Sequence, residues 1–246
     1  MMIDSIRPVR QLIVSALLCL VALCAPLQAQ DAPLAPYTAE YDVIRNGKTL
    51  GSSRVSLSRD GSNWRYDADT TGDRGMASLL GLKITQRMDF TWKDAMPQPA
   101  TSDYDQQATL GSRTVNVRYD WAARSYRLTD RKGEHRHAIV DGISDRYGSG
   151  VSIAAKLAGG ATDFTLPVAH ADGIRDWRFR VAGRETVDTP SGPVDAVKVE
   201  RVRDDADRTT ISWHDPARDF LAVRLMQEED GDTTETRLRS WSKTGD

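Results

Sequence analysis

From residue 37 onward, apolar and polar residues alternate along most of the chain. In the stretch YTAEYDVI the odd-numbered residues from Tyr37 to Val43 are apolar or aromatic, and the Asn46-Gly47 dipeptide that follows is a strong hairpin signal. Similar alternating runs recur, separated by short turns such as Asp60-Gly61 and Asp172-Gly173. The pattern predicts a mainly β protein, an antiparallel meander that forms a curved sheet, a half-barrel or a barrel-like sandwich.

The spacing of apolar residues changes once, from every second residue to the three- or four-residue spacing of a helix, in the stretch SDRYGSGVSIAAKLAGG. This spacing predicts one substantial helix over about 144–158, with Ser144 as its N-cap and Gly159 as its end. A helix at this point could divide the chain into two sub-sheets near residues 141–160.

The N-terminal stretch is typical of a secretory signal peptide. Arg7 and Arg10 precede an apolar run from Leu12 to Ala25, which is too short for a permanent transmembrane helix, and small residues follow up to Ala29. We therefore expect a signal peptide over 1–29, cleavage near Ala29/Gln30, and a single β-rich domain over 30–246 in the periplasm. No second apolar segment of spanning length follows, so we expect no membrane span in the mature chain.

The two cysteines, Cys19 and Cys24, both lie in this expected leader, and each follows a leucine. A lipoprotein signal needs a small residue before the acylated cysteine, so lipid anchoring is not expected. A mature chain without cysteine has no disulfide, thiolate metal site or cysteine nucleophile.

The charges are balanced, with 33 basic and 35 acidic side chains and a formal net charge of −2. Such a balance creates no general field that would attract nucleic acid or an anionic membrane. Arginines at positions 113, 118, 124 and 127 are interleaved with aromatic residues, but acidic neighbours offset them. We therefore expect no nucleic-acid partner.

His135 and His137 are the best metal-ligand candidates, because residues two apart on a strand point the same way. Two ligands are too few for a zinc site, and nothing in the sequence positions His170, His214 or Asp141 as a third. A solvated strand explains the two histidines more simply. We expect no metal and no cofactor.

Other catalytic or calcium-binding patterns are incomplete. The acidic segments 204–207 and 228–235 lack the ligand spacing of an EF-hand and read as charged hairpin tips. The GSGVS stretch at 148–152 lacks the G-x-S-x-G spacing of a nucleophile elbow. Two carboxylates can also meet in the folded protein although they are far apart in the sequence, and a pair of this kind could hydrolyse a glycosidic bond. Hydrolysis of an envelope polymer is therefore kept as the less favoured alternative.

An apolar segment, GMASLLGL, lies between Gly75 and Leu82 in this otherwise alternating chain. One interpretation is a core plug that closes one end of a barrel. The other is a lid over an apolar groove, because glycines permit movement and methionine adapts to varied surfaces. The lid and groove candidates from this segment and the next strand are Met76, Leu79, Leu80, Leu82, Met88, Phe90 and Trp92.

Four stretches carry a family resemblance, namely the Tyr37-x-x-x-Tyr41 pattern before NGKTLG, DGISDRY, VAGRETVDTPSGPVDAVKVER and WHDPARDFLAVRLMQEEDGD. They resemble the domain of unknown function 3108 family of exported bacterial envelope proteins. The resemblance covers nearly the whole mature chain and implies an exported β-rich fold, without implying a reaction. The expected architecture is also similar, more distantly, to the half-barrels that carry lipoproteins or lipids across the periplasm.

These features favour a periplasmic, non-enzymatic binding or carrier module for an apolar or lipid-like ligand, or for an envelope component. The alternative from a different class is a structural or interaction protein of the cell envelope that docks a partner protein through its sheet edges.

Overall fold

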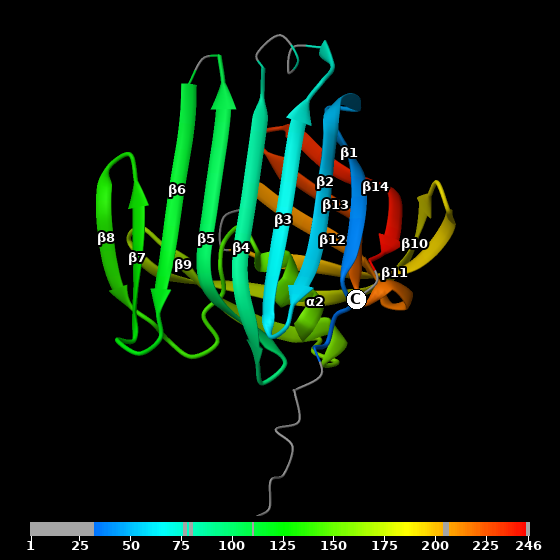
Figure 1. Ribbon diagram of the computed structural model, residues 1–246. Helices are drawn as coiled ribbons and strands as arrows, with labels where there is room; N and C mark the ends of the chain where they lie inside the picture. Colours follow the sequence, from blue (N-terminus) through cyan, green and yellow to red (C-terminus); the bar gives the residue numbers. More distant parts are fainter. Residues whose placement is uncertain (1–31, 76–77, 79–80, 110, 204–206, 245–246) are drawn as a thin grey trace, which may run out of the picture.

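The fold is one antiparallel sheet of fourteen strands with one α-helix, over the residues that the structure describes (Figure 1). This computed structural model describes residues 32–75, 78, 81–109, 111–203 and 207–244. The elements are β1 (Tyr37–Arg45), β2 (Lys48–Asp60), β3 (Asn63–Gly72), β4 (Lys83–Lys93), β5 (Met96–Ala108), β6 (Gly111–Asp120), β7 (Ser125–Asp130), β8 (Gly133–Ala138), α2 (Ser149–Ala158), β9 (Asp163–His170), β10 (Gly173–Thr189), β11 (Gly192–Val202), β12 (Arg208–Asp215), the 3-10 turn η1 (Pro216–Arg218), β13 (Leu221–Glu229) and β14 (Asp232–Lys243).

The strand order is that of a meander whose chain ends meet in the middle of the sheet. Strands β1 to β8 follow one another outward on one side, and β14 back to β9 follow on the other, because β14 pairs with β1. Strands β8 and β9 are therefore the two edges. The sheet is not closed, and the segment between β8 and β9 joins its edges instead of dividing it. Figure 1 shows the sheet curved into an open half-barrel.

Local sequence explains the hairpins. At the β1–β2 turn, Asn46 has φ 49° and Gly47 has φ 75°, the left-handed pair that a two-residue hairpin loop of this kind requires. Gly51 on β2 is needed for a different reason, since a Cβ at this position would overlap the backbone of Thr71 on β3.

The two edges of the sheet are held close by contacts that are not a strand ladder. The segment between β8 and α2 forms an isolated parallel bridge, in which Ser144 N donates to Pro167 O at 2.7 Å and Ala169 N donates to Ser144 O at 3.2 Å. Nearby, the Tyr126 hydroxyl donates to His170 O at 2.8 Å. These contacts make the open sheet barrel-like.

The helix α2 begins at Ser149, five residues after the predicted N-cap, so Ser144 does not cap it. The reason is tertiary, because the backbone of Ser144 is bonded to β9 and extended. The buried Asp145 carboxylate instead accepts from Tyr147 N and Gly148 N at 2.7 and 2.8 Å. The helix ends at Gly159, as predicted.

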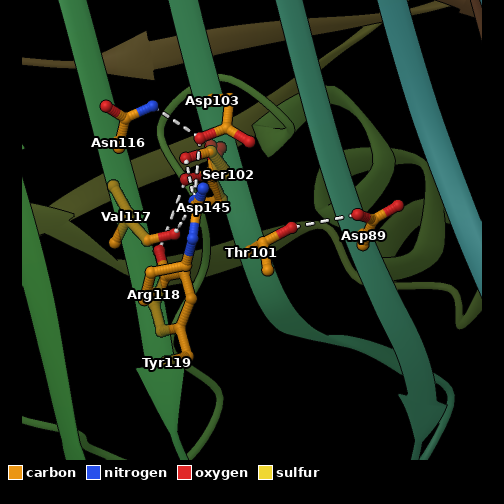
Figure 2. A network of polar contacts seen from close by, with 9 residues as sticks. All are labelled: Asp89, Thr101, Ser102, Asp103, Asn116, Val117, Arg118, Tyr119 and Asp145. Atoms are coloured by element: carbon orange, nitrogen blue, oxygen red, sulfur yellow. Dashed lines mark hydrogen bonds and ion pairs between the residues drawn. The ribbon is translucent and has the colours of Figure 1, made fainter.

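Figure 2 shows how Asp145 meets the sheet. The Tyr119 hydroxyl on β6 donates to Asp145 Oδ2 at 3.3 Å. Burial raises the pKa of the Asp145 carboxyl, against the lowering effect of its hydrogen bonds. Next to this contact, Arg118 Nη1 on β6 pairs with Asp103 on the neighbouring strand β5 at 2.8 Å. Asp145 thus fixes the entry to the helix against β6.

Helix α2 packs against both walls of the half-barrel. Val151 and Ala154 belong to a buried cluster with side chains of β2 to β4, and Ile153 and Leu157 to another with side chains of β9 to β11. The helix therefore fills one part of the interior and leaves another part open. Among the described residues, no helix combines the length and the apolar content needed to cross a membrane.

Candidate ligand cavity

A cavity of about 800 Å³ occupies the part of the half-barrel that α2 does not fill. This volume lies within the range of protein pockets that hold small organic ligands, roughly 300 to 1,000 Å³. Its lining comes from α2 and from strands on both sides of the sheet, mostly from alternate residues that face inward.

One wall of the cavity is apolar and continuous. Phe220, after η1, packs against both clusters that α2 forms with the sheet, so it joins the two sets of side chains. The apolar lining residues of these clusters include Leu34, Val151, Ile153, Ala154, Phe179, Val199 and Phe220. A ligand with an apolar portion would gain by covering this wall, at roughly 25 cal/mol per Å² removed from water.

Another part of the lining is rich in arginine. Six arginines line the cavity with only two aspartates, and no lysine is present in the lining. They are Arg113, Arg146, Arg175, Arg201, Arg203 and Arg208, and the aspartates are Asp176 and Asp219. Arg208 pairs with Glu229 at 2.9 Å, so its charge is balanced.

Two of these arginines flank a pair of stacked tyrosines. The Tyr104 and Tyr147 rings lie 4.5 Å apart with an interplanar angle of 15°. The Arg113 guanidinium carbon lies 5.7 Å from the Tyr104 ring centre, and that of Arg146 lies 6.0 Å from the Tyr147 ring centre. Within the described residues, neither Arg113 nor Arg146 forms an ion pair with a carboxylate, so aromatic faces are their neighbours.

A second aromatic group lies at the start of β10. Arg201 on β11 stacks on Trp177, with its guanidinium carbon 3.7 Å from the ring centre. The edge of the Trp177 ring meets His170, with ring centres 5.9 Å apart. Arg175, which also lines the cavity, pairs with the exposed Asp172.

His170 stays neutral in this environment. Burial is the largest cause that lowers its pKa to about 4, and the positive charges of Arg146, Arg175 and Arg201 add to it. Its Nε2 atom is buried and has no hydrogen-bond partner within the described part of the chain. Arg146, Arg175 and Arg201 line the same cavity as His170.

His214 on β12 is the other histidine of the lining, and it is fully enclosed. Its Nδ1 donates to Phe220 O at 2.9 Å, which leaves Nε2 to accept from the Ser212 hydroxyl at 2.8 Å. Desolvation lowers the pKa of His214 to about 4. Tyr66, another lining residue, has a pKa raised to about 12 by burial, so it stays a neutral phenol.

The lid and groove candidates from the sequence lie elsewhere or outside the described residues. Met76, Leu79 and Leu80 fall outside them, so the choice between lid and core plug stays open. Leu82 precedes β4, and its carbonyl accepts from Gly72 N at 2.8 Å. Met88, Phe90 and Trp92 are not among the lining residues. Met88 and Phe90 are 1% and 2% exposed beneath α2, and Trp92 packs against the same cluster.

The histidines considered as metal ligands have other neighbours. His135 Nε2 lies 3.4 Å from Asp130 Oδ1, and His137 Nε2 lies 2.9 Å from Ala171 O. Asp141 pairs with Arg124 at 2.7 Å. Across the described ranges, no three His, Cys, Asp or Glu side chains gather in a way that could hold a metal ion.

The sequence analysis does not predict the arginine-rich lining, although the alternation of polar and apolar residues on β12 is a signal for it. On β12 the residues Arg208, Thr210, Ser212 and His214 alternate with Ile211 and Trp213. Both faces of this strand contain buried residues, so its polar face points to a polar interior rather than to solvent. Of the four arginines interleaved with aromatic residues, those at positions 118, 124 and 127 pair with acids at 2.8, 2.7 and 3.4 Å, and only Arg113 lines the cavity.

The fold and the cavity together define an open, barrel-like β-sheet protein with a ligand-sized interior. The chain belongs to a family described as protein of unknown function (DUF3108), whose family model matches residues 37–239. The family resemblance seen in the sequence motifs is thereby confirmed. No curated protein matches the sequence.

The solved structures that are similar to this chain include the following two. The beta-barrel-like protein of the DUF1849 family from Brucella abortus has a TM-score of 0.51 and 10% identity, over 86% of this chain and 99% of that chain. A DUF1089 family protein from Pseudomonas aeruginosa has a TM-score of 0.32 and 13% identity, over 70% of this chain and 87% of that chain. The first similarity supports the barrel-like fold alone, and the second carries no argument.

Proposed function

We propose that this protein is a periplasmic, non-enzymatic binding or carrier module for a ligand with an apolar part. The observation that carries the proposal is the cavity of about 800 Å³ with a continuous apolar wall on α2. Concave pockets of this size, lined by apolar side chains together with a few polar groups, are typical of small-molecule sites. A cavity of this size therefore favours ligand binding. The basic, apolar and small-residue order of the N-terminal sequence supports export.

An envelope hydrolase is the second candidate, because Ser212 and His214 form a hydrogen-bonded pair inside the cavity. Two features weigh against it. The third partner of the pair is the Phe220 carbonyl and not a carboxylate, and a histidine with a pKa near 4 is a weak general base at neutral pH. Labelling with a fluorophosphonate tests this candidate, since a covalent adduct on Ser212 would contradict a non-enzymatic role.

Docking through sheet edges has less support than ligand binding. Both edges already contact other parts of the chain, through the Ser144 bridge on β9 and the bond from His137 on β8 to Ala171 O. Strand addition needs an edge with unpaired backbone groups. A partner that paired with β9 would have to displace the Ser144 bridge.

The carrier proposal is tested by blocking the cavity without disturbing the core. Gly150 lines the cavity, is exposed, and has no atom within 4 Å of the position that a Cβ would take. We expect the purified protein to bind the neutral apolar dye N-phenyl-1-naphthylamine saturably. Gly150→Trp should weaken this binding about tenfold, because the indole takes space from the ligand.

Ala158→Trp is the matched control. Ala158 is an exposed residue of the same helix that does not line the cavity, so this variant should bind the dye like the wild type. Absence of saturable dye binding to the wild type, or equal loss in both variants, would overturn the proposal.

A further inference from the structure

The strands at the centre of the sheet give the cavity a lining without charged side chains. Strands β4, β3, β2, β1, β14 and β13 are consecutive neighbours in the sheet. Their described residues that line the cavity are apolar or carry a hydroxyl or a carboxamide, and none is charged. Charged residues of the same strands pair on the other face, Arg54 with Glu40 and Arg87 with Asp67, both at 2.6 Å. We call the inward-facing set on these six strands the neutral lining.

Tyr37 and Tyr66 connect the neutral lining to the apolar wall. Both rings pack against the buried cluster that contains Val151 and Ala154 of α2, and both residues line the cavity. Neither phenol oxygen forms a hydrogen bond with another described residue. The hydroxyl of Tyr41, by contrast, already donates to Ala222 O at 2.9 Å. Two phenol groups are therefore available to a ligand that lies on the wall formed by α2.

Gln86 on β4 and Thr236 on β14 add further polar groups to the neutral lining. Their side chains, too, form no hydrogen bond within the described part of the chain. A phenol, a threonine hydroxyl and a carboxamide can each both donate and accept hydrogen bonds. The hydroxyl groups of a ligand do the same. A ligand head with several hydroxyls can therefore bind several of these residues at once, whereas an alcohol with one hydroxyl cannot.

The surroundings of the two phenols disfavour a charge on the ligand. Burial is the largest cause that raises the pKa of both Tyr37 and Tyr66, and it keeps the two phenols neutral. No arginine is among the causes for either phenol, whereas Arg113 and Arg146 act to lower the pKa of Tyr104. The same loss of hydration would penalise a charged ligand head beside Tyr37 and Tyr66.

We propose that the neutral lining binds an uncharged head with several hydroxyl groups, a glycosyl-type head, of an amphiphile whose apolar chain covers the wall on α2. This inference rests on the proposed carrier function and names its ligand class. Tyr37 and Tyr66 contact the apolar cluster through their rings and present their hydroxyls to the same cavity, so head and chain can be bound together.

The experiment compares four probes by calorimetric titration of the purified protein at neutral pH, each below its micelle-forming concentration. The probes are octyl β-glucoside, 1-octanol, methyl β-glucoside and octyl sulfate. We expect octyl β-glucoside to bind at least tenfold more tightly than each of the others. It alone combines an apolar chain with an uncharged head that carries several hydroxyls.

The double variant Tyr37→Phe/Tyr66→Phe removes two hydroxyls and retains both rings. It should weaken octyl β-glucoside binding about 5- to 100-fold and change 1-octanol binding by less than about twofold, because only the sugar uses the hydroxyls. The control Tyr126→Phe makes the same change at a buried tyrosine that does not line the cavity, and it should bind all probes like the wild type. Thermal melts establish that each variant is folded at the temperature of titration.

Each other outcome overturns a defined part of the reasoning. Equal affinity for octyl β-glucoside and 1-octanol, or equal weakening in Tyr126→Phe, removes the head-group site and leaves the carrier function standing. Methyl β-glucoside that binds as tightly as the octyl glucoside means a site for free sugar and removes the amphiphile. Octyl sulfate that binds as tightly removes the preference for a neutral head. If no octyl probe binds while N-phenyl-1-naphthylamine does, this inference alone fails; if the dye does not bind either, the carrier function fails with it.

Discussion

The buried His214 should make the protein less stable as the pH falls, in a way that one variant can isolate. The side chain is 2% exposed, and desolvation lowers its pKa to about 4, against 6.5 in the unfolded chain. Below about pH 6.5 the unfolded chain takes up a proton at this position while the folded protein does not. The unfolded state is therefore favoured as the pH falls, until the folded imidazole is also protonated near pH 4.

The magnitude follows from the two pKa values. Each pKa unit of difference corresponds to about 1.4 kcal/mol, so the full loss between pH 7 and pH 4 is about 3 kcal/mol. This loss is a large fraction of the ~5 to 15 kcal/mol that typically stabilises a domain. Asp145 acts in the opposite direction, because its raised pKa makes protonation favour the folded state.

The assay is urea unfolding of the wild type and His214→Gln at several pH values from 7.5 to 4. At pH 7.5 the wild type should be the more stable protein, because the variant disturbs the hydrogen bonds to Phe220 and Ser212. Its advantage should shrink by about 3 kcal/mol by pH 4. Contributions of Asp145 and His170 are present in both proteins and cancel in the comparison. If the difference in unfolding free energy stayed constant across this range, the reasoning about His214 would be refuted.

Two further substitutions, each with a matched control variant, test how the segment before α2 is held. Gly148→Ala should cost about 1 to 3 kcal/mol in urea unfolding, because its Cβ would come within 2.6 Å of Met88 Cε, whereas Gly150→Ala meets no atom and should be neutral or slightly stabilising. Equal effects of the two would contradict the close contact. Asp145→Ala should cost about 2 to 5 kcal/mol by the same measurement, since it leaves two backbone N–H groups and the Tyr119 hydroxyl without their acceptor. Asp145→Asn keeps an acceptor oxygen and should cost less than half as much; an equal loss in both would show that the hydrogen bonds are not the cause.

The helix shows where prediction from the sequence reached its limit. Helical spacing and Gly159 gave its existence and its end, because both are local signals. The predicted start lies five residues too early, because Ser144 is a good N-cap by residue type. A backbone bridge to β9, about two dozen residues further along the chain, took that residue into an extended conformation.

The candidate site was less accessible to sequence reasoning than the fold. Apolar alternation makes Met88 and Phe90 candidates, but a groove and a packed core share that property. In the structure both side chains pack beneath α2, and no local sequence pattern predicts this contact. The arginine lining was missed because its members are far apart in the chain and each, taken alone, looks like an ordinary surface residue.

The sequence by itself determined the strands, their antiparallel succession and the family, because alternation with period two and turn dipeptides such as Asn46-Gly47 act over a few residues. Only the tertiary structure decided that β14 pairs with β1, that the edges meet through Ser144, and that arginines from four elements face one cavity. The physical reason is that curvature accumulates over fourteen strands and their bulges. Which distant residues share the interior is therefore a property of the whole sheet and not of any segment.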